Sequence, residues 1–220
     1  MVANALKPMY SYYQRHAGKT FIVAGVGPSL KGFVPPKGVV TIGVNDIHEH
    51  PNASFVPDYL WIVDRTSSFV PERLERMKRY PNPTFTFLRF EASWKKVFPK
   101  TVLCPLAKAR KSQLLEWIDP TGNMPQVHHI GAGAPYGGVS LAGFMGAKKI
   151  GLIGADFTDH PSFHKQLDEV RLRWSELTSF LRGKDIDIVT LSKESALNSP
   201  DVMEYQSADE FAGRPSASAL

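Results

Sequence analysis

Short apolar runs, separated by polar segments that contain glycine or proline, recur along most of this chain. Continuous apolar runs bounded by turn residues are typical of strands that are buried on both faces of a sheet. The runs predict strands at 21–24, 39–44, 59–63, 84–90, 150–153 and 186–191.

Helical patterns appear between several of these runs. Pro71 stands where proline suits the first turn of a helix, and it predicts a helix over 71–79. A segment rich in small residues predicts a second helix over 138–147. A third helix, over 165–181, is expected to be amphipathic because its apolar residues recur at three- and four-residue spacing. These residues are Leu167, Val170, Trp174, Leu177 and Leu181.

Strands that alternate with helices at crossover spacing predict an α/β fold, a single Rossmann-like, doubly wound domain with a mostly parallel sheet. We expect this domain over 21–205, after a lead-in at 1–20 and before a flexible tail at 206–220. The segment 91–126 combines aromatic and basic residues and is a candidate lid insertion. A length of 220 residues suits one such domain.

Composition narrows the class of protein. Apolar residues make up 43% of the chain and charged residues 21%, as in ordinary globular proteins. No apolar run approaches the roughly 20 residues that span a bilayer, and no signal-peptide pattern opens the chain. Cys104 is the single cysteine and reads as a small buried side chain. These features together predict a cytoplasmic protein.

Charge is distributed unevenly along the chain. Segment 65–118 carries twelve Lys and Arg against four Asp and Glu, whereas 155–210 carries six against twelve. The basic segment could attract an anionic partner such as a nucleotide, an acidic sugar or a nucleic acid, or be a solvated face. No zinc-knuckle or helix-turn-helix pattern points to nucleic acid, and the sequence predicts no oligomeric state.

A glycine-containing turn follows the first predicted strand. Gly25, Gly27, Pro28 and Ser29 form a stretch of small residues that can present backbone N–H groups to a phosphate. Leu30 occupies the sixth position, where the dinucleotide fingerprint requires glycine or alanine, and no Gly-Lys-Ser/Thr sequence follows. The turn therefore predicts a nucleotide-type ligand without predicting NAD-dependent or P-loop chemistry.

A second small-residue turn is expected around Gly137 and Gly138, more than a hundred residues later and before another buried strand. Together the two turns predict that a nucleotide-type ligand binds at the strand ends of the sheet. Gly137 and Gly138 are therefore further candidate nucleotide-binding residues.

Polar side chains follow three of the predicted strands. Asn45 and Asp46 follow the strand at 39–44, Asp64 ends the strand at 59–63, and Asp156 comes shortly after 150–153. Because the carboxyl ends of parallel strands meet at one edge of a sheet, we expect these side chains to line the ligand site. Asn45 and Asp46 could instead serve only to form a turn.

Two histidines follow Asp156 at four-residue steps, His160 and His164. Such spacing could place a metal-binding set on one helix face, but Pro161 interrupts the helix and no third ligand is evident. Either histidine could act as a general base, because its pKa lies near neutrality. An exposed loop without a catalytic role is the remaining interpretation.

Several of these stretches together resemble one superfamily. Gly25-Val26-Gly27-Pro28-Ser29-Leu30, Val44-Asn45-Asp46 and the segment 145–157 are similar to those of bacterial family 42 sialyltransferases. They also resemble the related motility accessory factors and 6-hydroxymethylpterin diphosphokinase-like proteins. The likeness extends over about 20–198 and is concentrated in short blocks.

The resemblance to sialyltransferases implies a transferase that uses a sugar activated by cytidine monophosphate. It implies His164 or His160 as the base that deprotonates the acceptor hydroxyl. It also implies a set of nucleotide-binding residues, namely Gly25, Gly27, Pro28, Ser29, Asn45, Gly137 and Gly138.

The diphosphokinase branch implies a different chemistry, in which Mg²⁺ and the phosphates of ATP are held by Asp46 and Asp64 and a transferring phosphate is braced by Arg65. A third alternative is a nucleotide-binding module without catalysis. Val26 supports this alternative, because the sialyltransferase turn usually has Asn at that position, and so does the shortness of the segment around the histidines.

Overall fold

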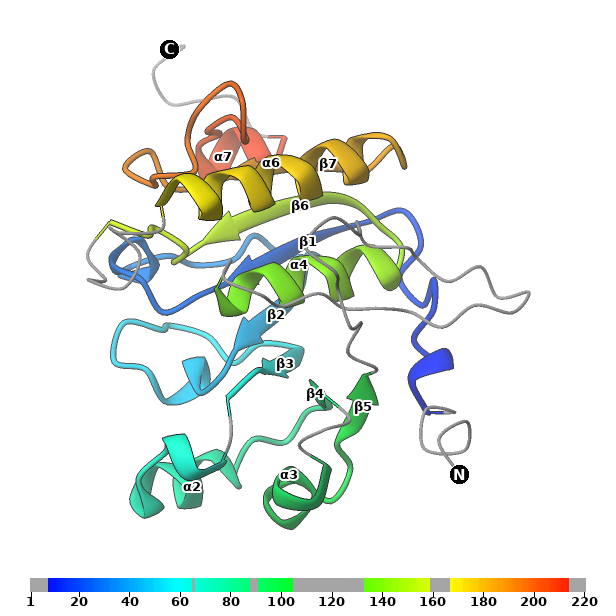
Figure 1. Ribbon diagram of the computed structural model, residues 1–220, viewed down its shortest axis with the longest axis vertical. Coiled ribbons are helices and arrows are strands. Elements are labelled where there is room, and N and C mark those ends of the chain that lie inside the picture. Colours follow the sequence, from blue (N-terminus) through cyan, green and yellow to red (C-terminus); the bar gives the residue numbers. More distant parts are fainter. Residues whose placement is uncertain (1–7, 65, 88–90, 105–132, 159–166, 214–220) are drawn as a thin grey trace.

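The computed structural model describes residues 8–64, 66–87, 91–104, 133–158 and 167–213. Its strands form a single sheet in the order β5-β4-β3-β2-β1-β6-β7, and every pairing is parallel (Figure 1). The α/β fold predicted from the sequence is therefore confirmed. The strands are β1 (Lys19–Ala24), β2 (Val40–Val44), β3 (Tyr59–Ile62), β4 (Thr84–Phe87), β5 (Val102–Cys104), β6 (Ala147–Ile153) and β7 (Asp187–Thr190).

Strand β1 lies near the centre of the sheet, between β2 and β6. Phe21 pairs with Val40 on one side and with Ile150 on the other. Residues Phe21 to Ala24 are fully buried, as expected for a parallel strand that is covered on both faces. This burial explains why the first strand reads as a continuous apolar run rather than as an alternation.

Two helices pack side by side across one face of the sheet, α4 (Ala134–Phe144) and α6 (Leu167–Arg182) (Figure 1). Helix α4 contacts β1, β2, β3 and β6, and α6 contacts β7. Tyr136 of α4 meets the ring of Trp174 of α6 edge-on, with the ring centroids 5.3 Å apart. The amphipathic face predicted for α6 is buried as expected.

Shorter helices connect the remaining strands, namely α2 (Pro71–Met77), α3 (Glu91–Val97) and the 3₁₀ turns η1 (Pro28–Leu30), η2 (Ile47–Glu49) and η3 (Thr66–Ser68). Pro71 occupies the first turn of α2, as the sequence predicts. Trp94 of α3 packs edge-on against Phe69 and is stacked on Phe98. The contact with Phe69 attaches α3 to the segment before α2, and α3 also packs against β4.

The segment expected to form a lid begins as part of the sheet. Residues 91–104 supply α3 and the edge strand β5, which pairs with β4 through Phe85 and Val102. Burial of Val102, Leu103 and Cys104 drives this pairing, so the prediction of an insertion is wrong for these residues. The remainder of the expected lid, 105–126, lies outside the described residues.

The expected tail also begins as ordered structure. Ser207 and Glu210 form a reciprocal capping box that starts α7 (Ala208–Phe211). Phe211 is only 4% exposed, and the ammonium of Lys149 lies 4.7 Å from the centre of its ring. Burial of this ring ties the segment to β6, so the prediction of a flexible tail is wrong for 207–213.

Two further predictions concern membrane spans and the single cysteine. Within the described residues, no helix is both long and apolar enough to cross a bilayer. Cys104 is buried in β5, as expected, and burial raises the pKa of its thiol so that it remains protonated.

Candidate functional site

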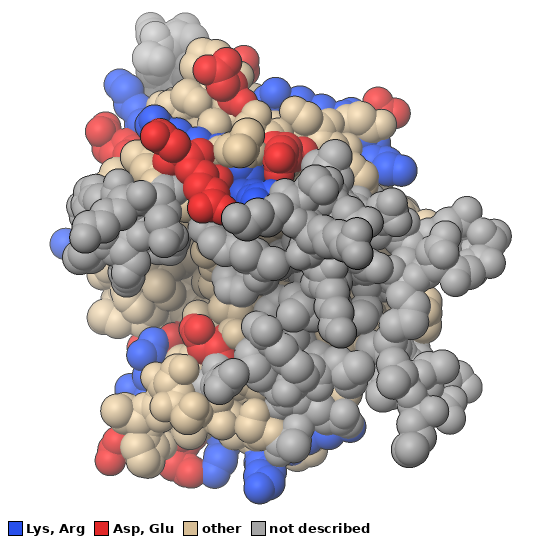
Figure 2. Space-filling model, in the orientation of Figure 1, with Lys and Arg blue, Asp and Glu red and all other residues tan. Residues whose placement is uncertain are grey.

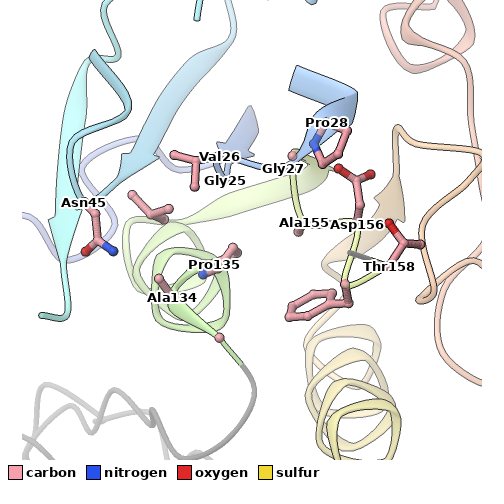
Figure 3. Close-up of a pocket in the computed structure, with 14 residues that line it drawn as sticks. Gly25, Val26, Gly27, Pro28, Asn45, Ala134, Pro135, Ala155, Asp156 and Thr158 are labelled. Atoms are coloured by element: carbon pink, nitrogen blue, oxygen red, sulfur yellow. The ribbon is translucent and has the colours of Figure 1, made fainter. Parts of the chain in front are cut away.

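A cavity of about 330 Å³ opens where β1, β2 and β6 end. Four short segments line it: the turn from Gly25 to Pro28, Val44 with Asn45, the N-terminus of α4, and the stretch from Gly154 to Thr158 (Figure 3). In open α/β sheets ligands bind at this edge, outside the carboxyl ends of the strands. The structure thus brings the first glycine turn, Asn45 and Asp156 together, as the sequence predicts.

The glycine turn lies against the backbone that follows β6. Gly25 donates its N–H to the carbonyl of Ile153 at 2.8 Å, and Gly27 donates to the carbonyl of Gly154 at 2.8 Å. A Cβ atom at Gly25 would lie 2.2 Å from the oxygen of Gly154, and one at Gly27 would lie 2.5 Å from the Asp156 carboxylate. Glycine is required here because the β1 and β6 backbones approach too closely for a side chain.

These hydrogen bonds determine which N–H groups of the turn remain available to bind an anion. The N–H groups of Gly25 and Gly27 are already bonded to carbonyl oxygens, and Pro28 has none. Among the described residues, the N–H of Val26 has no acceptor, and this residue is 40% exposed. The expectation that several N–H groups of this turn are presented to a phosphate is therefore wrong, because the chain uses most of them to join two strand ends.

Asp156 is the centre of a buried hydrogen-bond network. One carboxylate oxygen accepts from the N–H of Ser29 at 3.0 Å and from its hydroxyl at 2.9 Å. The other oxygen accepts from the hydroxyl of Ser192 at 2.6 Å. Ser29 in turn accepts the N–H of Gly154 at 2.9 Å. Asp156 and Ser29 therefore hold the glycine turn in place, and Asp156 also lines the cavity.

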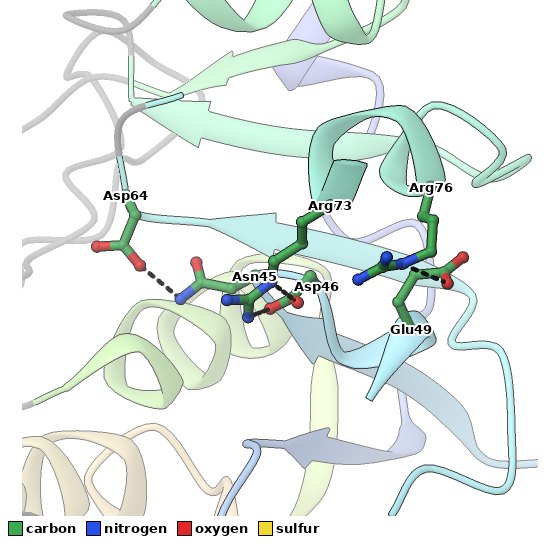
Figure 4. Close-up of polar contacts among 6 residues, drawn as sticks. All are labelled: Asn45, Asp46, Glu49, Asp64, Arg73 and Arg76. Carbon is green, nitrogen blue, oxygen red and sulfur yellow. Dashed lines mark hydrogen bonds and ion pairs between the residues drawn. The ribbon is translucent and has the colours of Figure 1, made fainter. Parts of the chain in front are cut away.

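Asn45 follows β2 with a left-handed backbone, φ 52°, which asparagine tolerates better than most residues. Its backbone N–H donates to the carbonyl of Trp61, and its side-chain carbonyl accepts the N–H of Val63 at 3.2 Å. Its amide nitrogen donates to the carboxylate of Asp64 at 2.7 Å (Figure 4). These bonds fix the orientation of the Asn45 side chain at the wall of the cavity.

Asp46 is held by an arginine that sequence analysis did not single out. Arg73 of α2 forms a two-pronged ion pair with the Asp46 carboxylate, which is 4% exposed (Figure 4). A metal ion could reach this carboxylate only by displacing the guanidinium. Among the described residues, no group of three possible metal ligands is found. Asp46, held by Arg73, therefore does not fit the Mg²⁺ site that the diphosphokinase resemblance implies, and for Asp64 that role stays a prediction.

The second predicted turn is not a turn. Gly137 and Gly138 lie inside α4 and are buried. A Cβ at Gly137 would lie 2.3 Å from Nε1 of Trp61, and one at Gly138 would lie 2.9 Å from Val23. These glycines allow α4 to pack closely on the sheet, and they do not line the cavity. The prediction of a nucleotide-binding turn here is wrong, because a helix interior leaves no free N–H groups.

The cavity is instead lined by the residues that begin this helix, Gly133, Ala134 and Pro135. Sequence analysis missed Ala134 and Pro135, although proline in the first turn of a helix is a known start signal. A helix N-terminus carries partial positive charge from its N–H groups and attracts anions. None of the lining residues is Lys, Arg or His, so α4 is the main positive element of the described cavity wall.

Phe157 is a further lining residue that the sequence did not reveal as part of the site. Its backbone has φ 57°, an uncommon value for an aromatic residue. A Cβ at Gly133 would lie 2.9 Å from the Phe157 ring, so this ring closes the cavity beside the start of α4. Only the folded chain shows this contact, because the two residues are distant in sequence. The candidate bases His160 and His164, and also Arg65, lie outside the described residues.

Comparison with solved structures gives the same fold. A mutant of the α-2,3/8-sialyltransferase CstII has a TM-score of 0.53 at 15% identity, over 86% of this chain and 88% of that chain. The sialyltransferase CST-II in complex with trisaccharide acceptor and CMP has a TM-score of 0.50 at 14% identity, over 86% and 87%. The chain has a sialyltransferase-like fold.

A third structure, of CstII from Campylobacter jejuni with CMP, has a TM-score of 0.49 at 14% identity, over 87% of each chain. At sequence identities of 14–15%, a likeness to solved structures shows a shared fold but not a shared activity. No family model matches the chain, and no curated protein matches it. The resemblance to motility accessory factors and diphosphokinases therefore stays a prediction.

Proposed function

We propose that this protein is a transferase that uses a nucleotide-activated sugar, most like a CMP-sugar glycosyltransferase of the sialyltransferase type. The observation that carries the proposal is the position of the cavity in a sialyltransferase-like fold: Asn45, Val26 and the residues that begin α4 line it at the strand ends. A cavity of about 330 Å³ lies within the size range of small-molecule sites.

In this proposal the cavity holds the nucleoside monophosphate part of the donor. The partial positive charge at the N-terminus of α4 and the N–H of Val26 stabilise the phosphate. In the first turn of α4, Pro135 has no N–H and the N–H of Tyr136 is bonded to the Gly133 carbonyl, so the helix contributes the N–H of Ala134 and its dipole. Asn45, fixed by Asp64 and Val63, hydrogen-bonds the ribose or the base. At Gly25 and Gly27 the close approach to Gly154 leaves no room for a side chain, so in this turn only Val26 and Pro28 present side chains to the cavity.

The chemistry is a displacement at the anomeric carbon of the sugar. The oxygen of an acceptor hydroxyl forms the new bond to that carbon, and the bond from the carbon to the phosphate oxygen breaks. His160 or His164 takes the proton of the hydroxyl. The departing nucleoside monophosphate keeps the electron pair, and donors at α4 stabilise its charge.

Binding of CMP measured by titration calorimetry tests the site. We expect wild-type protein to bind CMP equally well with Mg²⁺ and with EDTA, and Asn45→Gly to weaken binding about tenfold, the value of one lost hydrogen bond. Glycine keeps the left-handed backbone, so this change removes the amide and, with it, the bonds to Asp64 and Val63. Asn52→Gly, outside the cavity, is the matched control. Absence of CMP binding, or binding only with Mg²⁺, would overturn the proposal.

Turnover tests the catalytic part. Release of CMP from CMP-sialic acid in the presence of a sugar acceptor should fall by about 10² to 10⁴-fold in the variant that removes the base, His160→Ala or His164→Ala, with CMP affinity retained. If CMP binds but neither single variant nor the double variant changes turnover, the proposed base is wrong. If CMP binds and no acceptor supports turnover, the protein is a nucleotide-binding module.

A further inference from the structure

A second cavity, of about 380 Å³, lies at the opposite end of the strands from the first. It is formed by the α2–β4 connection, the α3–β5 connection and Tyr12 from the segment before β1. Thr84 begins β4 and Lys100 precedes β5, so this cavity opens at the amino ends of the strands, at the β5 end of the sheet (Figure 1). Nothing in the proposed transfer reaction uses it.

Two lysines from different connections line this cavity, Lys78 and Lys100. No carboxylate lines it. Lys78 is paired on the helix surface with Glu75 at 2.5 Å, and both side chains are exposed, so the pair is weak and exchangeable. Lys100 is exposed and has no carboxylate partner within the part of the chain that the structure describes.

The surroundings reinforce the positive charge. The sequence from 71 to 104 carries eight Lys and Arg against three Glu. Two of these cations, Arg73 and Arg76, are paired with Asp46 and Glu49 from outside the segment, so the excess is smaller than the count alone indicates. Lys and Arg side chains, with a few acidic ones among them, are spread over the end of the molecule formed by α2 and α3, whereas basic and acidic side chains lie interspersed near α6 (Figure 2). A ligand that enters this cavity therefore meets a local excess of positive charge.

The walls of the cavity are apolar rings with a few polar atoms. Three prolines, Pro81, Pro83 and Pro99, stand beside the buried ring of Phe98. Tyr12 is fixed edge-on against Phe85, with the centroids 4.9 Å apart. The Asn82 amide nitrogen donates to the carbonyl of Pro57 at 2.9 Å, which leaves the amide oxygen to accept from a ligand hydroxyl.

We propose that this second cavity binds an acidic monosaccharide unit, with its carboxylate between Lys78 and Lys100. The C–H faces of a pyranose ring match the proline and aromatic walls, and its hydroxyls match the Asn82 oxygen and the Tyr12 hydroxyl. The four residues of β3 span roughly 13 Å, so one monosaccharide cannot occupy both cavities. The proposal therefore stands independently of the proposed transferase activity.

Calorimetric titration with glucuronate tests this site, and glucose and acetate serve as probes of the ring alone and of the charge alone. We expect glucuronate to bind at least tenfold more tightly than either. The double variant Lys78→Gln/Lys100→Gln should lose at least tenfold in glucuronate affinity. The matched control Lys37→Gln/Lys96→Gln, which removes the same charge outside the cavity, should retain it.

The proposal would be overturned if glucuronate did not bind, or if acetate bound as tightly as glucuronate. It would also be overturned if both double variants lost glucuronate affinity to the same extent. The substituted side chains are exposed in the wild-type protein, so both variants should fold. A cooperative thermal unfolding transition in each variant checks this. CMP affinity should not change in either double variant. The result for the second cavity is therefore independent of the result for the proposed transferase site.

Discussion

Asp156 accepts two hydrogen bonds from Ser29, one from its N–H and one from its hydroxyl, across 127 residues of chain. This pair joins the turn after β1 to the turn after β6, and Ser192 adds the segment after β7. The buried carboxylate thus fixes three strand ends around the first cavity. Asp156 also lines that cavity, and its part in binding a nucleotide stays a prediction.

Substitution of Asp156 by asparagine should lower stability. The amide has one oxygen in place of two, so it cannot accept the bonds from Ser29 and Ser192 together. Hydrogen bonds to charged groups contribute about 1.5–3 kcal/mol each, and we expect a loss of about 3 kcal/mol in the free energy of unfolding by urea. Ser192→Ala, which removes one bond, should cost about 1–2 kcal/mol. An Asp156→Asn protein as stable as wild type would contradict this role.

Alanine in place of Gly27 should be strongly destabilising. The added Cβ would lie 2.5 Å from the Asp156 carboxylate and 2.8 Å from the Gly154 carbonyl, so the two turns must separate. We expect a loss of about 2–4 kcal/mol in chemical denaturation, comparable to other overpacked core substitutions.

The control for this prediction is Gly183→Ala. There a Cβ would meet carbonyl oxygens at 3.4 and 3.5 Å, which is ordinary contact, and the expected change is within about 0.5 kcal/mol. Similar losses at both positions would show that the close approach of the two backbones does not decide the effect.

Removal of Arg73 should leave a buried charge without its partner. Arg73→Met is expected to cost about 2–3 kcal/mol in unfolding free energy, a value reduced from fully buried pairs because the Arg73 side chain is 38% exposed. The double variant Arg73→Met/Asp46→Asn should recover part of the loss. If Asp46 instead serves as a metal ligand, Asp46→Asn alone would abolish any Mg²⁺-dependent stabilisation by ATP while leaving unfolding unchanged.

The stability of the protein should fall on acidification through pH 6.5. Burial lowers the pKa of His48 below its usual 6.5, against the smaller opposing effects of Glu49 and Asp46. Both ring nitrogens are buried without a hydrogen-bond partner among the described residues, and the ring packs against Tyr80. The unfolded chain therefore binds a proton at a higher pH than the folded chain does.

This difference makes stability greatest above pH 6.5, and the contribution is lost as the pH falls from 6.5 toward the lower folded-state pKa. Burial lowers the pKa of His16 in the same direction. We expect His48→Phe to give a shallower dependence of unfolding free energy on pH between 7.5 and 5.5. Parallel curves for His48→Phe and wild type would contradict this assignment.

The predicted strand that contains Phe21 and the predicted helix that contains Trp174 are both found where the sequence placed them. Their burial patterns are local, because a strand covered on both faces is continuously apolar and a one-sided helix repeats every three or four residues. The convergence of Asn45, Asp64 and Asp156 at one edge also followed from the sequence, since parallel strands share the direction of their ends.

What the tertiary structure decided is the role of each small or charged residue. The sequence could not tell that Gly137 faces Trp61, that Asp46 is paired with Arg73, or that the N–H of Gly27 is bonded to Gly154. Each depends on a partner from another segment, brought near by packing. A residue's type and local spacing determine which element it joins, but its available hydrogen bonds depend on which distant groups the fold has already placed beside it.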